Sequence, residues 1–167
     1  MRENVIYEER VSSSWTQALF WGLTAIFSLL LAWRTVTSGA DGLGVAFLLF
    51  ALVFLFYSLN YRLLVIRLSS EALRLQFGIF TWTIPLDNVE ARGPDDNLPA
   101  LMKYGGAGIH FMFIRGRYRA SFNFLEHPRV VIALRRPRVV RDVSFSTRCP
   151  DDVIRHLDAA VSARGAA

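Results

Sequence analysis

The sequence predicts an α+β chain in which an apolar helical hairpin precedes seven antiparallel strands and one C-terminal helix. Two uncharged apolar stretches lie near the N-terminus, short alternating segments follow from residue 61, and a segment with helix signals closes the chain. Of the 167 residues, 53% are hydrophobic, which is high for a soluble domain of this length. We therefore expect a tail over residues 1–14, a transmembrane hairpin over residues 15–60 and a folded domain over residues 61–167.

The two apolar stretches have the length of membrane-spanning helices. Residues 15–33 form an uncharged stretch that would extend about 28 Å as a helix, close to the thickness of a hydrocarbon layer. Residues 43–59 form a second uncharged stretch. Trp15 and Trp33 flank the first stretch, as is typical of aromatic rings at headgroup depth. Neither stretch has a polar face for water, so we predict two spans rather than two buried core helices.

The residues around the hairpin predict its orientation. Residues 34–42 contain Ser, Gly and Asp and turn the chain back, so both ends of the hairpin lie on one side. Arginines precede and follow the hairpin, whereas the connecting turn contains only Arg34. The positive-inside bias therefore places both termini in the cytoplasm. A cleaved signal peptide fits poorly, because the residues before the first span mix acids with bases and a second span follows directly.

Small residues form one stripe along the first span. They are Ala18, Gly22, Ala25, Ser28 and Ala32, and such a stripe lets another helix approach closely. Two interpretations stay open. The simpler one is packing within the hairpin, against the Phe and Leu side chains of the second span. The alternative is docking against a helix of a partner protein.

From residue 61 onward the pattern predicts antiparallel strands with turn signals at intervals of about eight to twelve residues. Pro85 predicts an edge or a kink in a long third strand. The seven expected strands cover residues 64–68, 73–77, 81–93, 109–114, 118–124, 130–134 and 139–145.

The last segment predicts a helix over about residues 150–163. Pro150 suits the first helical position, Asp151 and Asp152 complement the positive helix N-terminus, and Gly165 suits the stop. One side of this helix is apolar. We therefore expect it to cover the sheet.

Two stretches of the domain resemble the bacterial pleckstrin-homology-like family of small membrane proteins. Residues 69–93 (SSEALRLQFGIFTWTIPLDNVEARG) are similar to the family's pattern of strand, Gly turn and Ile-Pro-Leu. The second stretch begins at residue 108 (GIHFMFIRGRYRASFN) and continues over residues 129–157 to the terminal helix. The resemblance covers about residues 61–162. It implies a seven-stranded antiparallel barrel or sandwich capped by the C-terminal helix, in a membrane-tethered interaction module of the inner, cytoplasmic membrane.

Positive charge is concentrated in two predicted turns. The net charge is +5, and between Arg115 and Arg141 the only acidic residue is Glu126. In a simple meander the two basic turns would share one end with Tyr61 and the turn at Gly78, facing the bilayer. The candidate contacts with anionic lipid are Arg115, Arg117, Arg135, Arg136 and Arg138, and the candidate bilayer-facing apolar residues are Ile79, Phe80 and Trp82. The alternative is a pair of solvated turns that follow the positive-inside bias.

Nucleic-acid binding and catalysis find little support in the sequence. Phe122 and Phe124 are predicted to face away from Arg119, so no stacking platform is expected. The three histidines have no metal-ligand spacing with the one cysteine, Cys149. The adjacent carboxylates of residues 95 and 96 fall in a loop, where the separation needed for acid and base catalysis is not fixed.

The sequence therefore predicts a protein that is not an enzyme and needs no cofactor, metal or small-molecule substrate. We expect a membrane-anchored interaction module, acting as an accessory or scaffold subunit that binds a membrane-protein partner at the lipid bilayer. The alternative is a peripheral reader of anionic lipid that uses a basic, membrane-facing end. Formation of a homo-oligomer stays open.

Overall fold

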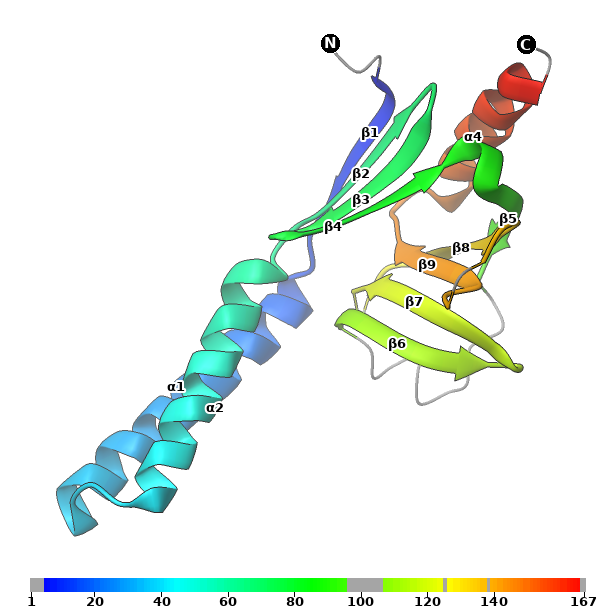
Figure 1. Cartoon of the computed structure of the whole chain (residues 1–167). Helices are drawn as coiled ribbons and strands as arrows, with labels where there is room; N and C mark the ends of the chain where they lie inside the picture. Colours follow the sequence, from blue (N-terminus) through cyan, green and yellow to red (C-terminus); the bar gives the residue numbers. More distant parts are fainter. Residues whose placement is uncertain (1–4, 96–106, 125, 138, 166–167) are drawn as a thin grey trace.

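The computed structural model describes residues 5–95, 107–124, 126–137 and 139–165. In this part of the chain a helical hairpin projects from a domain of two sheets, and a third helix lies beside the sheets (Figure 1). The elements in chain order are β1 (Val5–Val11), α1 (Ser14–Ser38), α2 (Gly42–Asn60), β2 (Leu64–Ser69), β3 (Ala72–Phe77), β4 (Phe80–Pro85), the 3-10 turn η1 (Leu86–Asn88), β5 (Val89–Pro94), β6 (Gly108–Ile114), β7 (Arg117–Asn123), β8 (Arg129–Leu134), β9 (Asp142–Ser146) and α4 (Pro150–Gly165).

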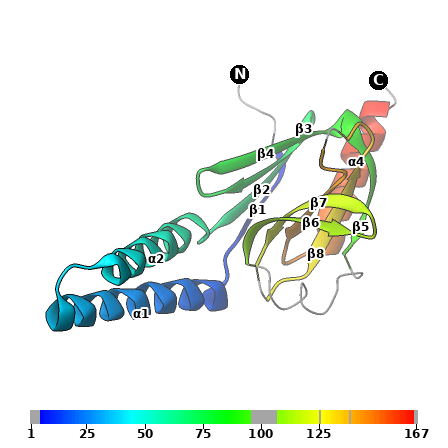
Figure 2. The same cartoon turned by 60° about the horizontal axis from the view of Figure 1, so that its bottom comes forward.

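Helices α1 and α2 form the predicted hairpin, which points away from both sheets (Figure 2). The Ser13 side chain caps α1 by accepting a 3.0 Å hydrogen bond from the Thr16 amide. Asp41 caps α2 in the same way, accepting a 2.9 Å bond from the Gly44 amide. Such caps satisfy amides that the first helical turn leaves unpaired. Both helices are long and apolar enough to cross a membrane, judged by length and composition.

The first sheet has the strand order β1-β2-β3-β4 and is antiparallel throughout. Its strand β1 corrects the prediction of a simple tail, because Val11 pairs with Leu64 and the ladder continues to Val5. Glu8 of β1 is hydrogen-bonded by Arg67 of β2 at 2.9 Å, and this bond together with one from Arg10 lowers the pKa of Glu8. The helical hairpin is therefore an insertion between two neighbouring strands of one sheet (Figure 1).

The second sheet has the order β5-β8-β9-β7-β6, and its β7–β9 pair is parallel while the other pairs are antiparallel. The prediction of seven strands in a meander is thus wrong. Over the described residues there are nine strands and no closed barrel. The predicted third strand, residues 81–93, is two strands in different sheets, separated by η1. Pro85 ends the first of them, where its missing amide cannot extend a ladder.

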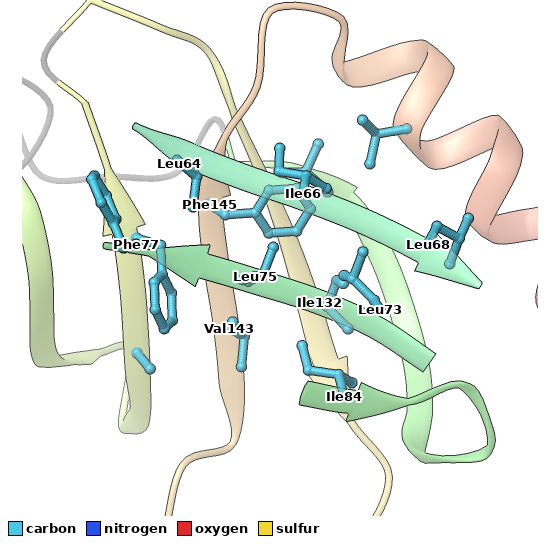
Figure 3. Packing of buried hydrophobic residues seen from close by; sticks show 14 of the residues in the cluster. Leu64, Ile66, Leu68, Leu73, Leu75, Phe77, Ile84, Ile132, Val143 and Phe145 are labelled. Carbon is cyan, nitrogen blue, oxygen red and sulfur yellow. The ribbon is translucent and has the colours of Figure 1, made fainter. Parts of the chain in front are cut away.

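The core lies between the two sheets and under α4. Leu64, Ile66, Leu75 and Phe77 of the first sheet are 0% exposed and face Phe145 and its neighbours from the second sheet (Figure 3). Burying an aliphatic or aromatic side chain of this size stabilises the fold by about 1.5–3 kcal/mol. The predicted apolar side of the C-terminal helix is confirmed, since Val153, Ile154, Leu157, Ala160 and Val161 all pack against this core.

Glu9 of β1 anchors the C-terminal helix. Its carboxylate accepts hydrogen bonds from the Arg148 amide at 2.8 Å and the Thr147 hydroxyl at 2.5 Å, directly before α4. It also accepts a 3.0 Å bond from the Tyr7 hydroxyl, whose ring packs on His156 of α4. Burial, followed by the charge of Glu9, raises the pKa of Tyr7. The strand that precedes the hairpin is thus joined to the helix that ends the chain.

Replacing Glu9 with Ala tests this anchor. The change leaves the Thr147 hydroxyl, which is 0% exposed, and the Arg148 amide without their acceptor. We expect the free energy of unfolding to fall by about 1–3 kcal/mol. The matched control is Glu8→Ala, which removes a surface ion pair with Arg67 and should destabilise the domain less. Chemical unfolding followed by near-UV circular dichroism measures both losses, and equal losses would contradict the anchoring role.

Candidate interaction surfaces

The two helices of the hairpin contact each other through aromatic rings on both helices and through small residues of α2. The Phe27 ring of α1 stacks on Phe50 and Phe54 of α2, with centroid distances of 5.0 and 5.5 Å. The small or polar residues of α2 that are buried against α1 recur at every seventh position: Gly44, Ala51 and Ser58. This spacing keeps small side chains on one face of a helix, so the backbones can approach closely.

The predicted stripe of small residues on α1 faces away from α2. All five of its members are exposed, namely Ala18, Gly22, Ala25, Ser28 and Ala32. A Cβ atom added at Gly22 would meet nothing within 4 Å. The simpler interpretation, packing within the hairpin, is therefore wrong. The stripe is thus open to contacts from outside the hairpin.

Only residues 61–63 separate α2 from the first sheet, and the contacts there are close. Asn60, the last residue of α2, accepts a 2.9 Å hydrogen bond on its side-chain oxygen from the Ile79 amide. Gly78 has a φ of +57°, and a Cβ atom there would lie 2.2 Å from that same oxygen of Asn60. The Tyr61 ring packs edge-on against Phe77 at 5.0 Å. The turn between β3 and β4 is therefore fixed against the end of the hairpin.

Two of the three predicted bilayer-facing residues lie at this turn. Ile79 is 75% exposed and Phe80 is 42% exposed. Trp82 lies farther along β4, where its half-buried ring packs at 6.2 Å against Phe122 of the second sheet. Ile79 and Phe80 thus form an exposed apolar tip beside α2. Trp82 belongs to the space between the sheets.

The turn that carries Arg135 and Arg136 lies at the opposite end of β4. The Arg135 amide donates to the Asn88 carbonyl at 2.8 Å, and the Arg136 amide donates to the Asn88 side chain at 2.7 Å. Arg136 also pairs with Asp87 at 2.5 Å. Strand β4 separates these residues from the Gly78 turn by about 17 Å. Arg138 lies outside the described residues.

The second basic turn is also distant from the hairpin. Gly108, at the start of β6, lies against the Tyr61 ring, so the turn at Arg115 occupies the far end of β6. Arg117 pairs with Asp142 at 2.8 Å, and this contact raises the pKa of Arg117. The two basic turns do share an end of the second sheet, because the Arg141 amide donates to the Tyr118 carbonyl at 2.7 Å. The expectation that they also share an end with Tyr61 is wrong, since the sheets do not form one meander.

A buried ion network lies on the face of β7 that points away from the core. Arg119 contacts Asp95 at 2.7 Å and Asp142 at 3.6 Å. The three side chains are only 9%, 2% and 5% exposed. Ser144 donates a further 2.8 Å hydrogen bond to Asp95. Asp95 lies in a loop, as predicted, but its carboxylate is held in a buried ion pair with Arg119.

An apolar groove runs along β4, between the two sheets. Strand β4 is one edge of the first sheet, and β6 is one edge of the second. The groove contains two adjoining cavities of ≈330 and ≈300 Å³, and Trp82 lines both. The first cavity is bounded by Tyr61, Phe80, Thr81, Trp82, Ile109, Phe111 and Phe122, and the second by Trp82, Thr83, Ile84, Pro85, Asn88, Leu134, Arg136, Val139 and Val140. The one signal of this groove in the sequence is Pro85, which predicts an edge of the sheet.

The histidines make local contacts. His110 and His127 each place Nε2 within hydrogen-bond distance of a backbone carbonyl, at 2.7 and 2.9 Å. His156 packs against the ring of Tyr7. Among the residues that the structure describes, no group of three or more His, Cys, Asp or Glu side chains could hold a metal ion.

The chain matches no protein-family model, and comparisons with curated proteins and with solved structures gave no significant match. The resemblance to the pleckstrin-homology-like family therefore stays a prediction.

Replacing Gly78 with Ala tests the contact between the hairpin and the domain, with Gly116→Ala as the matched control. Both glycines have a positive φ, +57° and +75°, so Ala is strained at either position. At Gly116 the new Cβ meets nothing within 4 Å, whereas at Gly78 it overlaps Asn60. We expect Gly78→Ala to lower the free energy of unfolding by about 1–3 kcal/mol more than the control. Thermal unfolding of the two variants gives this difference, and a difference near zero would argue against a rigid junction.

Proposed function

We propose that the chain is a membrane-anchored interaction module, an accessory or scaffold subunit that binds a protein partner at the bilayer. The observation that carries this proposal is the exposed stripe on α1, which α2 leaves uncovered. In lipid, helices associate mainly through close backbone approach, and stripes of small residues allow it. Around Gly22 there is open space for the side chains of a second helix.

The membrane location and the family-like architecture are parts of the same proposal. Two adjacent apolar helices of 25 and 19 residues support a transmembrane hairpin. Arg34, the only basic residue of the predicted outer turn, is paired with Asp41 at 2.5 Å, which supports a cytoplasmic position for both termini. Two sheets around one core with a C-terminal helix packed on it support a pleckstrin-homology-like domain.

The junction between hairpin and domain supports a scaffold role. The hairpin continues into β1 at one end and into β2 at the other, and these strands are paired. A domain mounted in this way keeps one orientation relative to the bilayer. The exposed tip of Ile79 and Phe80 then lies at headgroup depth, where apolar side chains are accommodated.

The alternative role, reading anionic lipid with the basic turns, has weaker support. Both basic turns lie away from the hairpin end of the domain. Arg117 and Arg136 already pair with Asp142 and Asp87. Attraction to an anionic leaflet falls off within about 10 Å at ordinary salt, so turns held at the far end of the domain gain little from it.

Enlarging Gly22 tests the proposed function. The full chain is captured from its native membranes, and co-purified membrane proteins are quantified by mass spectrometry. We expect Gly22→Leu to reduce a stoichiometric partner at least tenfold, because the new side chain fills the stripe. The matched control is Leu30→Ile, which conserves the side-chain volume on the side of α1 away from the stripe and should leave capture unchanged.

A second variant separates the two roles. Changing Arg115 and Arg117, which lie at the basic turn away from the groove along β4, to Gln should preserve capture of the partner. Loss of function in this variant but not in Gly22→Leu would favour the lipid-reading role. Failure of the intact chain to capture any stoichiometric membrane protein would overturn the proposed function.

A further inference from the structure

We infer that the groove along β4 binds an extended segment of the partner protein by strand addition. The bound segment would carry apolar side chains at alternate positions and an acidic side chain at the end near η1. This inference rests on the proposed function and specifies which part of the domain contacts the partner.

The free main chain of β4 is the first argument. Among the described residues, β3 is the only strand that pairs with β4. The turn between them contains two residues, so the flanking pair Phe77–Phe80 exchanges hydrogen bonds and the next pair does not. The amide and carbonyl groups of Thr81 and Thr83 therefore point to the open side. Pro85 is the next alternate residue after Thr81 and Thr83, so its nitrogen also points to the open side. Proline has no amide hydrogen, which fits a position without a partner strand.

The cavities beside this edge are the second argument. Trp82 stands between a cavity of ≈330 Å³ near Phe80 and one of ≈300 Å³ near Ile84. Paired residues on neighbouring strands point to the same face, so the residues of an added strand opposite Phe80 and Ile84 would place their side chains on either side of Trp82, about 13.6 Å apart. Across the groove, Phe111 and Phe113 of β6 are 52% and 72% exposed. An added apolar strand would cover these rings.

The charge at the η1 end is the third argument. Arg136 lines the second cavity and is the one charged residue among the described residues of its lining, and it pairs with Asp87. The side chain of Arg136 is 68% exposed, so its pair with Asp87 is open to an additional carboxylate. The first cavity is lined by no charged residue. A partner segment with an acid at its η1 end therefore matches the groove.

Two other occupants fit less well. The acyl chain of a lipid would fill the apolar cavities but would leave the amides of Thr81 and Thr83 unpaired. A second copy of the chain would pair its own β4 with this edge, and β4 carries threonines rather than acids in the positions that would approach Arg136. The experiment below distinguishes both from a partner segment.

The probe is a displayed library of random ten-residue peptides, selected against the full chain in lipid nanodiscs. We expect enrichment of sequences with alternating apolar residues and one terminal Asp or Glu. The best peptide is then synthesised, and its Kd is measured. Thr83→Pro removes an outward amide and should raise the Kd at least tenfold above that of Thr83→Ala, which makes a similar change to the side chain but keeps the amide.

Two further comparisons keep the inference testable even where Thr83→Pro folds poorly. N-methylation of alternate amides in the peptide should raise the Kd at least tenfold with the unchanged protein. Arg136→Gln should raise the Kd at least threefold. Its matched control is Arg155→Gln, which removes an arginine of similar exposure that is paired with Asp152 on α4.

Selection of no common pattern, or a Kd insensitive to N-methylation, would overturn the inference. Self-association that Thr83→Pro abolishes, without peptide binding, would assign the edge to a second copy instead. Gly22→Leu should leave the peptide Kd unchanged. If partner capture depends on Gly22 but no peptide binds, the proposed function stands and only the inference of strand addition is overturned.

Discussion

The pairing of β1 with β2 is the contact on which the rest of the molecule depends. The two strands are neighbours in one sheet, yet the entire helical hairpin lies between them in sequence. Paired strands lie about 4.8 Å apart, whereas packed helices lie about 8–10 Å apart. The hairpin therefore has to converge where it meets the sheet. Buried Thr16 and Ser58 permit this convergence, and Gln17 donates a 3.5 Å hydrogen bond to the Ser58 carbonyl there.

The same pairing brings the ends of the hairpin next to contacts with the C-terminal helix and with both sheets. Glu9 bonds the loop before α4, and His127 from the loop before β8 contacts the carbonyl of Ser12. On the other side, Asn60 holds the turn at Gly78. Each of these contacts involves a residue at or beside a hairpin terminus. A force or a partner acting on the hairpin is consequently transmitted to both sheets rather than absorbed by a linker.

Local pattern predicted the elements whose own residues determine them. The apolar helices, strands β2, β3, β6, β7 and β8, and the C-terminal helix follow from periodicity and caps. Strand β1 was missed because its centre, Glu8 to Arg10, is charged and is compensated by partners more than fifty residues away, such as Arg67. Two features of the sheets were not predicted: the predicted third strand is divided between two sheets, and β7 pairs with β9 in parallel. Both depend on which strands share a sheet, and the alternation of apolar and polar residues along one strand carries no information on that.

The surfaces were harder to predict than the elements. Helical spacing predicted that the small residues around Gly22 share one face of α1. It did not predict that Phe20 and Phe27, on another face, would pack against α2. Likewise, the sequence predicted the two basic turns but not the ion pairs of their arginines with Asp87 and Asp142. A pattern identifies residues that lie together on one element, and the topology decides what that element faces.

The position of α4 determines which edge of the domain is left open. The helix contacts β1, β2, β5, β8 and η1, and so it covers the side of the core where the two sheets are joined by η1. One helix of this length does not also reach the β4 and β6 edges on the other side. There Phe111 and Phe113 are exposed and Trp82 is only half-buried. Unpaired edges next to exposed aromatic rings favour association with another chain. The domain retains such an edge beside the turn at Gly78, which is held against the end of the hairpin by Asn60.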